Sequence, residues 1–189
     1  QYFNLVKYIL GISAFYHDSS AALIKDGEII SAVQEERFTR IKYDSGFPKQ
    51  SIKYILKSNS LELNQIDKII FYEKPFLKFE RLIETYLAFA PKGIKQFCLS
   101  MPLWLREKLF QKNLILKKLK HIDQNFKNEN KLLFCEHHLS HAASAFYPSP
   151  FEESLILTID GVGEWATTTV GIGTGKKIKI IKEINFPHS

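Results

Sequence analysis

Residues 8–33 read YILGISAFYHDSSAALIKDGEIISAV and contain three short strand-like segments in succession. Each segment is rich in Ile, Leu, Val or Ala, and a polar loop separates the first from the second. An Asp-Gly pair separates the second from the third, and such a pair is a strong signal for a tight hairpin turn. The pattern therefore predicts an antiparallel unit of three strands. These strands are expected at residues 8–12, 21–25 and 28–33, with the turn at Asp26 and Gly27.

The same order of elements returns between residues 155 and 184. A buried strand there ends in the loop DGVGEW, and two further strands follow across a glycine-containing turn. The residues between the two copies alternate between helical and strand-like patterns. This repetition predicts an α/β protein with two related halves, each of which begins with strand hairpins. The second copy has expected strands at 155–159, 167–172 and 178–184, and a helix at 48–58 and a strand at 68–72 lie between the copies.

Three histidines stand in the stretch CEHHLSHAASAFYPS, which covers residues 135–149. If residues 136–146 are helical, His137 and His141 lie one turn apart on the same face and can share a metal ion. His138 points about 100° away from them, which places it behind the site or on the surface. The alternative is that one histidine caps the helix and the others are ordinary polar surface residues.

Asp160 strengthens the metal interpretation because it follows the buried strand at 155–159 directly. Ligands of open α/β sheets bind outside the carboxyl ends of the strands, so a carboxylate at this point is aimed at a site. Gly161 and Gly163 allow the chain to turn and let another group approach the backbone closely. The alternative is a turn aspartate that bonds only to its own loop. We expect His137, His141 and Asp160 to converge.

The net charge of +6 is concentrated in one segment, since 13 basic residues and five acidic residues lie between Lys74 and Lys131. Leucines recur there at helical spacing, which favours a solvated helical insert at about residues 76–128. Aromatic and basic residues are poorly interleaved, so nucleic acid is not the expected partner. The chain shows no signal peptide, no long uncharged apolar stretch and no metal-type cysteine spacing. This composition predicts a soluble cytoplasmic protein without membrane contact.

Four sequence blocks carry a closer resemblance, in the order YHDSSAAL, EERFTR, HHLSHAASAFY and TIDGVGEW. On these blocks the chain resembles the carbamoyltransferases of the nodulation and antibiotic-tailoring type, over nearly its whole length. The resemblance implies an actin-like ATPase superfamily fold, with a ribonuclease-H-like half on a mixed five-stranded sheet. Residues 1–150 would form this half, with the helical insert at 76–128, and residues 151–189 would begin a second, truncated half. The family's YrdC-like C-terminal domain is absent from this chain.

The resemblance also implies a reaction. In that family the C-terminal domain makes carbamoyl-adenylate from carbamoyl phosphate and ATP. The N-terminal domain then transfers the carbamoyl group to a hydroxyl of a small-molecule acceptor, such as a sugar, a nodulation factor or an antibiotic. The partners expected for this chain are therefore that acceptor and the missing C-terminal domains. The isolated chain is expected to be inactive, and the open edge of its second sheet favours self-association, for example as a homodimer.

Site roles follow from the resemblance residue by residue. His137, His141 and Asp160 are expected to hold a divalent metal of the Fe(II) type, with a further aspartate supplied from downstream. His17 lies in the loop after the first strand and is expected to act as a general base near carbamoyl-adenylate or the acceptor. The alternative for His17 is an ordinary loop histidine exposed to water.

Asp18, Gly161 and Gly163 are expected to lie at the nucleotide, because backbone N–H groups in such turns form anion-binding nests. Basic residues near the EERFTR block have two interpretations, as phosphate ligands or as surface partners of neighbouring acids. These basic residues are Arg37, Arg40 and Lys42, and the acids are Glu35 and Glu36.

Two other functions stay open on the sequence. The first is a relative of the enzyme that installs threonylcarbamoyl on tRNA adenosine, which shares the fold and the H-x-x-x-H motif. Residues 11–20, GISAFYHDSS, depart from the sequence typical of that relative. The second is a non-catalytic fragment that binds a metal or a nucleotide. The sequence does not identify the acceptor.

Overall fold

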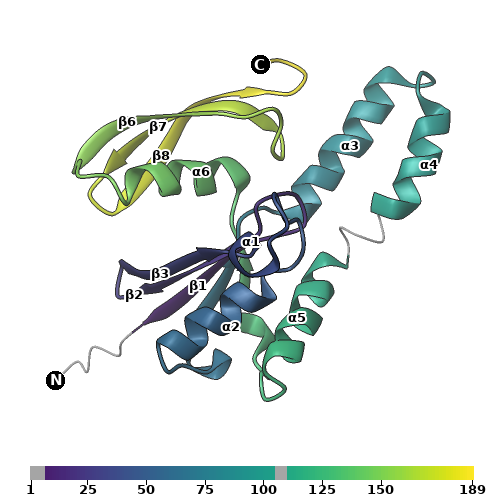
Figure 1. Ribbon diagram of the computed structural model, residues 1–189. Coiled ribbons are helices and arrows are strands. Elements are labelled where there is room, and N and C mark those ends of the chain that lie inside the picture. The colour runs from purple at the N-terminus through teal and green to yellow at the C-terminus, as the bar shows by residue number, and fades with distance from the viewer. Residues whose placement is uncertain (1–6, 105–109) are drawn as a thin grey trace. The chain divides into compact units, whose positions relative to one another are not determined.

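The computed structural model describes residues 7–104 and 110–189, which divide into two compact units (Figure 1). The first unit holds the described residues up to Tyr72 together with Lys112–Phe134. The second unit holds the described residues of Glu73–Gln111 and Cys135–Ser189.

The first unit is built on a five-stranded mixed sheet. Strands β1, β2 and β3 pair as antiparallel neighbours, while β4 and β5 add to the other side of β1 in parallel. The resulting order, β3-β2-β1-β4-β5, is the ribonuclease-H-like arrangement that the sequence predicted, and the fold prediction is confirmed. The strands are β1 (Tyr8–Ser13), β2 (Ser20–Lys25), β3 (Glu28–Gln34), β4 (Lys68–Phe71) and β5 (Leu132–Phe134).

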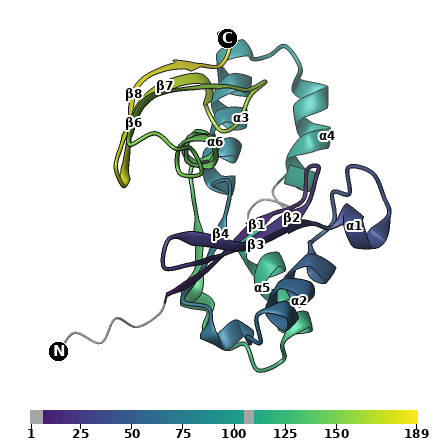
Figure 2. The same ribbon diagram turned by 60° about the vertical axis from the view of Figure 1, so that its left-hand side comes forward.

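Two helices bury the core of this sheet, α2 (Lys49–Ser58) and α5 (Gln111–Ile122), and both lie on the same side of it (Figure 2). Their apolar residues recur three or four positions apart, which is the spacing that places them on one helix face. Short elements complete the unit, namely α1 (Glu36–Thr39), η1 (Leu63–Gln65) and η3 (Glu129–Lys131). The fully buried side chains include Leu10, Leu23, Ile52, Ile55, Ile69, Phe71, Ile115 and Leu119.

Glu35 joins the end of β3 to the start of α2. Its carboxylate is 3% exposed and accepts hydrogen bonds from the backbone N–H of Gln50 and Ser51, both at 2.8 Å. It also accepts one from the Ser51 hydroxyl at 2.6 Å. The helix begins after Pro48, whose side chain cannot accept a hydrogen bond, so Glu35 takes over the capping role. These contacts give the first acid of the EERFTR block a structural role.

The second unit has a three-stranded antiparallel sheet in the order β6-β7-β8, with α6 packed along one face (Figure 1). Phe146 of α6 lies so close to Gly173 that a Cβ there would come within 2.6 Å of the ring. The opposite face of β6 exposes Leu155, Leu157 and Ile159. The elements are α3 (Pro75–Phe89), α4 (Ile94–Trp104), α6 (His137–Phe146), β6 (Glu153–Ile159), β7 (Ala166–Thr174) and β8 (Lys177–Asn185).

The expected insert at 76–128 is helical at α3, α4 and α5, while residues 105–109 lie outside the described residues. The contacts group α6 with the second sheet, whereas the division at residue 150 assigned this helix to the first half. That domain division stays a prediction. Across the described residues, none of the helices has both the length and the apolar character needed to cross a membrane.

Replacement of Glu35 by alanine should destabilise the protein by about 2–4 kcal/mol, because three donors would lose a buried charged acceptor. Equilibrium urea unfolding measures this loss. Glu28→Ala is the matched control, since Glu28 is exposed at the start of β3 and should change stability by about 0.5 kcal/mol or less. Equal losses in the two variants would contradict the capping role of Glu35.

Candidate functional site

Three side chains of the second unit converge at the start of α6. His137 is the first residue of this helix, His141 follows one turn later, and Asp160 comes directly after β6. The distance from His137 Nε2 to Asp160 Oδ2 is 2.8 Å, and that from His137 Nε2 to His141 Nε2 is 3.1 Å. One ligand atom from each residue lies within 4.8 Å of the others. The structure therefore brings together the three residues that were expected to meet.

These distances suit one shared metal ion. Two neighbouring ligands with bonds of about 2.0–2.2 Å to the same ion lie about 3 Å apart, close to both measured separations. The side chain of His137 is 13% exposed and that of Asp160 is 29% exposed, while His141 is exposed. The cluster is thus shielded around His137 and open beside His141.

The charges of the cluster also suit a cation. Burial, together with the neighbouring His141, lowers the pKa of His137 despite the attraction of Asp160. The neutral imidazole that results is the form that binds metals. Burial opposes the ionisation of Asp160, but the Gly161 N–H and the two imidazoles outweigh it and hold the pKa of Asp160 below its ordinary value. The donor set is two imidazoles and one carboxylate.

The ring of His137 leaves no room for a side chain at position 163, so this position requires glycine. A Cβ at position 163 would lie 2.5 Å from His137 Cδ2, whereas one at Gly161 would meet no described heavy atom within 4 Å. The sequence predicted that another group lies close to the backbone at Gly163, and in the structure this group is the side chain of His137. Whether Gly161 and Gly163 also contact a nucleotide stays a prediction.

Helix α3 supports the DGVGEW loop at two points. The Arg81 guanidinium, which is buried, donates from Nη1 to the carbonyl of Gly163 at 3.1 Å. The backbone N–H of Lys74 donates to Glu164 Oε1 at 2.5 Å. The sequence did not reveal either support, because Arg81 lies in the basic insert and looks like any surface cation. Glu164 belongs to the TIDGVGEW block, and its place in that block was the one feature of the sequence that could have pointed to a role at the site.

His138 lies on the sheet side of α6 and is buried. Its Nδ1 is 2.6 Å from Thr158 Oγ1, which is in turn 2.6 Å from Thr169 Oγ1. This chain of polar contacts fixes α6 on β6 and β7. Of the two positions expected for His138, the structure excludes the surface.

His17 and Asp18 belong to the first unit and pair with each other in the loop between β1 and β2. His17 Nδ1 is 2.7 Å from Asp18 Oδ2, and the His17 side chain is 61% exposed. A carboxylate accepts hydrogen bonds, so Nδ1 is the donor of this pair, and Asp18 does not engage Nε2. The expectation that His17 acts as a general base stays a prediction, as does the nucleotide role of Asp18.

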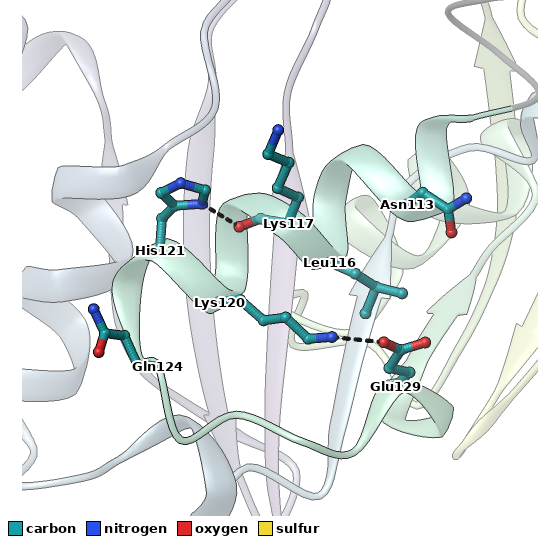
Figure 3. A pocket seen from close by; sticks show the side chains of 7 residues that line it. All are labelled: Asn113, Leu116, Lys117, Lys120, His121, Gln124 and Glu129. Carbon is teal, nitrogen blue, oxygen red and sulfur yellow. Dashed lines mark hydrogen bonds and ion pairs between the residues drawn. The ribbon is translucent and has the colours of Figure 1, made fainter.

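A groove on the first unit lies between α5 and the loop that follows it (Figure 3). Lys120 Nζ pairs there with Glu129 Oε1 at 2.7 Å, and His121 Nδ1 lies 2.6 Å from the carbonyl of Lys117 on its own helix. Lys120 and Glu129 therefore contact each other, and the side chains drawn in Figure 3 do not converge on a common point. We do not assign the groove a catalytic role.

Replacement of Gly163 by alanine should destabilise the protein by about 1–3 kcal/mol, because the new methyl group would displace the ring of His137. Gly161→Ala is the matched control in the same loop and should cost about 0.5 kcal/mol or less. Urea denaturation of both variants measures the difference. A Gly163→Ala variant as stable as Gly161→Ala would show that the ring of His137 is not packed on this loop.

Comparison with known proteins identifies relatives of this chain. An uncharacterized protein of Synechocystis sp., sll1178, is 56% identical over 183 residues, which cover 96% of this chain and 30% of that protein. The nodulation protein NolNO of Sinorhizobium fredii is 37% identical over 180 residues, which cover 94% of this chain and 24% of NolNO. The chain thus spans between about a quarter and a third of the length of these relatives.

Two solved structures are also similar. One is a crystal structure of an uncharacterized protein with similarity to peptidase YEAZ from Pseudomonas aeruginosa. It is 13% identical with a TM-score of 0.47, and the match covers 96% of this chain and 67% of that one. The other, YeaZ from Pseudomonas aeruginosa, has a TM-score of 0.45 at 13% identity and 68% coverage of that chain. Residues 8–189 match the family described as carbamoyltransferase N-terminus, and the chain belongs to this family.

Proposed function

We propose that this chain forms the N-terminal part of an O-carbamoyltransferase. The observation that carries the proposal is the convergence of His137, His141 and Asp160 in a member of the carbamoyltransferase N-terminus family. The donor would be carbamoyl-adenylate, made from carbamoyl phosphate and ATP by another part of the full-length protein. The acceptor would be a hydroxyl group of a small molecule such as a sugar, a nodulation factor or an antibiotic.

A divalent metal, Fe(II) in our proposal, would be held by His137, His141 and Asp160. Two imidazoles and one carboxylate are a donor set typical of non-haem Fe(II) sites with open coordination positions. When bound, such an ion supplies a Lewis acid that polarises a carbonyl or phosphoryl oxygen. The residues of the chain provide the two imidazoles, the carboxylate whose pKa is held below its ordinary value, and the open side next to His141.

His17 would act as the general base of the transfer. Its Nδ1–H donates to Asp18, which orients the ring and leaves Nε2 to accept the proton of the acceptor hydroxyl. Removal of this proton makes the oxygen a better nucleophile towards the carbamoyl carbon. The new C–O bond would replace the bond from that carbon to the phosphate oxygen of carbamoyl-adenylate, and AMP would leave. In this proposal Asp18 acts on the imidazole, in addition to any contact that it makes with the nucleotide.

The first test of the proposal is metal binding by the full-length protein. His137→Ala and Asp160→Asn should each abolish stoichiometric Fe(II) and, with it, carbamoyl transfer, because each removes one of the proposed ligands. His121→Ala is the control, since His121 is an exposed histidine of α5 in the groove of Figure 3. Metal content is measured after anaerobic reconstitution. Carbamoylated products are measured by mass spectrometry with carbamoyl phosphate, ATP and a panel of hydroxyl acceptors.

Wild-type protein that carries no metal, or a His137→Ala variant that keeps full occupancy, would contradict the metal site. Wild-type protein that binds Fe(II) but carbamoylates none of the hydroxyl acceptors would instead favour a non-catalytic metal-binding role.

The second test separates His17 from the metal. His17→Ala should lower turnover by about 100-fold or more, which is the usual contribution of a general base, while Fe(II) content stays unchanged. The variant is compared with wild type for both quantities in the same preparation. If turnover and metal content fall together, His17 is a ligand or a structural residue. If neither falls, its catalytic role is wrong.

A further inference from the structure

The carboxylate of Glu164 lies where two helices of the second unit begin. It accepts the backbone N–H of Lys74, which precedes α3. Burial raises the pKa of Glu164, and the backbone N–H groups of Lys74 and of His137, the first residue of α6, oppose that rise. Glu164 is 7% exposed, so this carboxylate is almost fully removed from water. A buried carboxylate is costly unless it is hydrogen-bonded, and here its described hydrogen bonds come from backbone groups at two helix starts.

Neither helix supplies a cap of its own. Among the described residues, the side chains of the N-cap residues Lys74 and Glu136 accept no hydrogen bond from the helices that they precede. The first N–H groups of a helix have no partner within the helix, and they favour a nearby negative charge. Glu164 meets both needs from the DGVGEW loop.

The same loop holds His137 at three places. Asp160 contacts its ring nitrogen, Gly163 packs against its ring, and Glu164 interacts with its backbone N–H. The loop is therefore linked to His137 twice: Asp160 contacts the ring, and Glu164, four residues later, interacts with the backbone. The contact to Glu164 constrains how far the start of α6 can move away from the end of β6.

We propose that Glu164 is a positioning residue that presets the separation between His137 and Asp160, so that the metal site is formed before the ion arrives. This inference rests on the proposed metal site but concerns a residue outside the ligand set. Its consequence is quantitative: loss of the carboxylate should weaken metal binding without removing a ligand.

The experiment compares Glu164→Gln with wild type in the full-length protein. Glutamine has the same size but offers one carbonyl oxygen, and its NH₂ group would oppose a backbone donor. Co(II) serves as the probe, because calorimetry gives its affinity and its visible absorption reports ligand geometry. We expect Co(II) affinity to fall about 10-fold to 100-fold, as for other partners that orient metal ligands, with a changed absorption band.

Hydrogen exchange in the metal-free protein provides a second readout. The amides of residues 137–141 should exchange faster in Glu164→Gln, because the first turn of α6 loses its cap. The amide of Ile156 in β6 should keep its protection, since the sheet does not depend on the carboxylate.

Glu136→Gln is the matched control. It removes a negative charge at the start of the same helix, but the Glu136 side chain is exposed and pairs with Lys74 Nζ at 2.7 Å. This variant should keep wild-type Co(II) affinity and wild-type exchange. If both glutamine variants behave alike, charge and not the hydrogen bond is responsible, and the proposal is overturned.

Two further outcomes would overturn it. One is a Glu164→Gln variant with wild-type affinity and exchange. The other is loss of protection at Ile156 as well, because Glu164 would then support the fold and not the site. If wild-type protein does not bind Co(II), the proposed metal function fails, while the exchange data still decide whether Glu164 fixes the start of α6.

Discussion

The contact between His137 and Asp160 is the constraint on which the candidate site depends. It joins the first residue of α6 to the residue that directly follows β6, 23 positions later in the chain. A histidine at the start of a helix has little freedom if its ring packs against a glycine backbone. Gly163 provides that surface, and any side chain at this position would push the ring away. The site thus depends on close packing between the start of α6 and the DGVGEW loop.

Helix α3 shows how the loop itself is held. The sequence predicted a solvated helix here, but its first two turns carry buried charges. Lys78 pairs with the buried Glu73 at 3.0 Å, and the Arg81 guanidinium lies 5.7 Å from the ring centre of Phe186. Burial lowers the pKa of Arg81, whereas Asp160 and Glu73 oppose that shift. Buried charges are tolerated where they have such partners, so this end of the segment belongs to the site's support.

The sequence predicted the features that rest on local patterns. Alternating apolar residues and the Asp-Gly turn gave the hairpins, and the four-residue spacing gave His137 and His141 on one face. The sequence did not predict contacts between residues far apart in the chain, because a local pattern does not show which distant residue a side chain contacts. Arg81 and Gly163 are 82 positions apart, and Lys74 and Glu164 are 90 positions apart. The orientation of Glu35 towards α2 escaped for the same reason, although the block that contains it was noticed.

The exposure of the cluster is uneven, and this unevenness matters for chemistry. Helix α6, Gly163 and the loop enclose His137, while His141 and Gly161 remain accessible from outside. If these three residues hold a divalent ion, as we propose, its remaining coordination positions would be reached from the accessible side. A substrate oxygen or an additional carboxylate would therefore approach past His141. Rigid support behind the ligands and an open front are the two properties that a site needs to accept a group and release it without losing its metal.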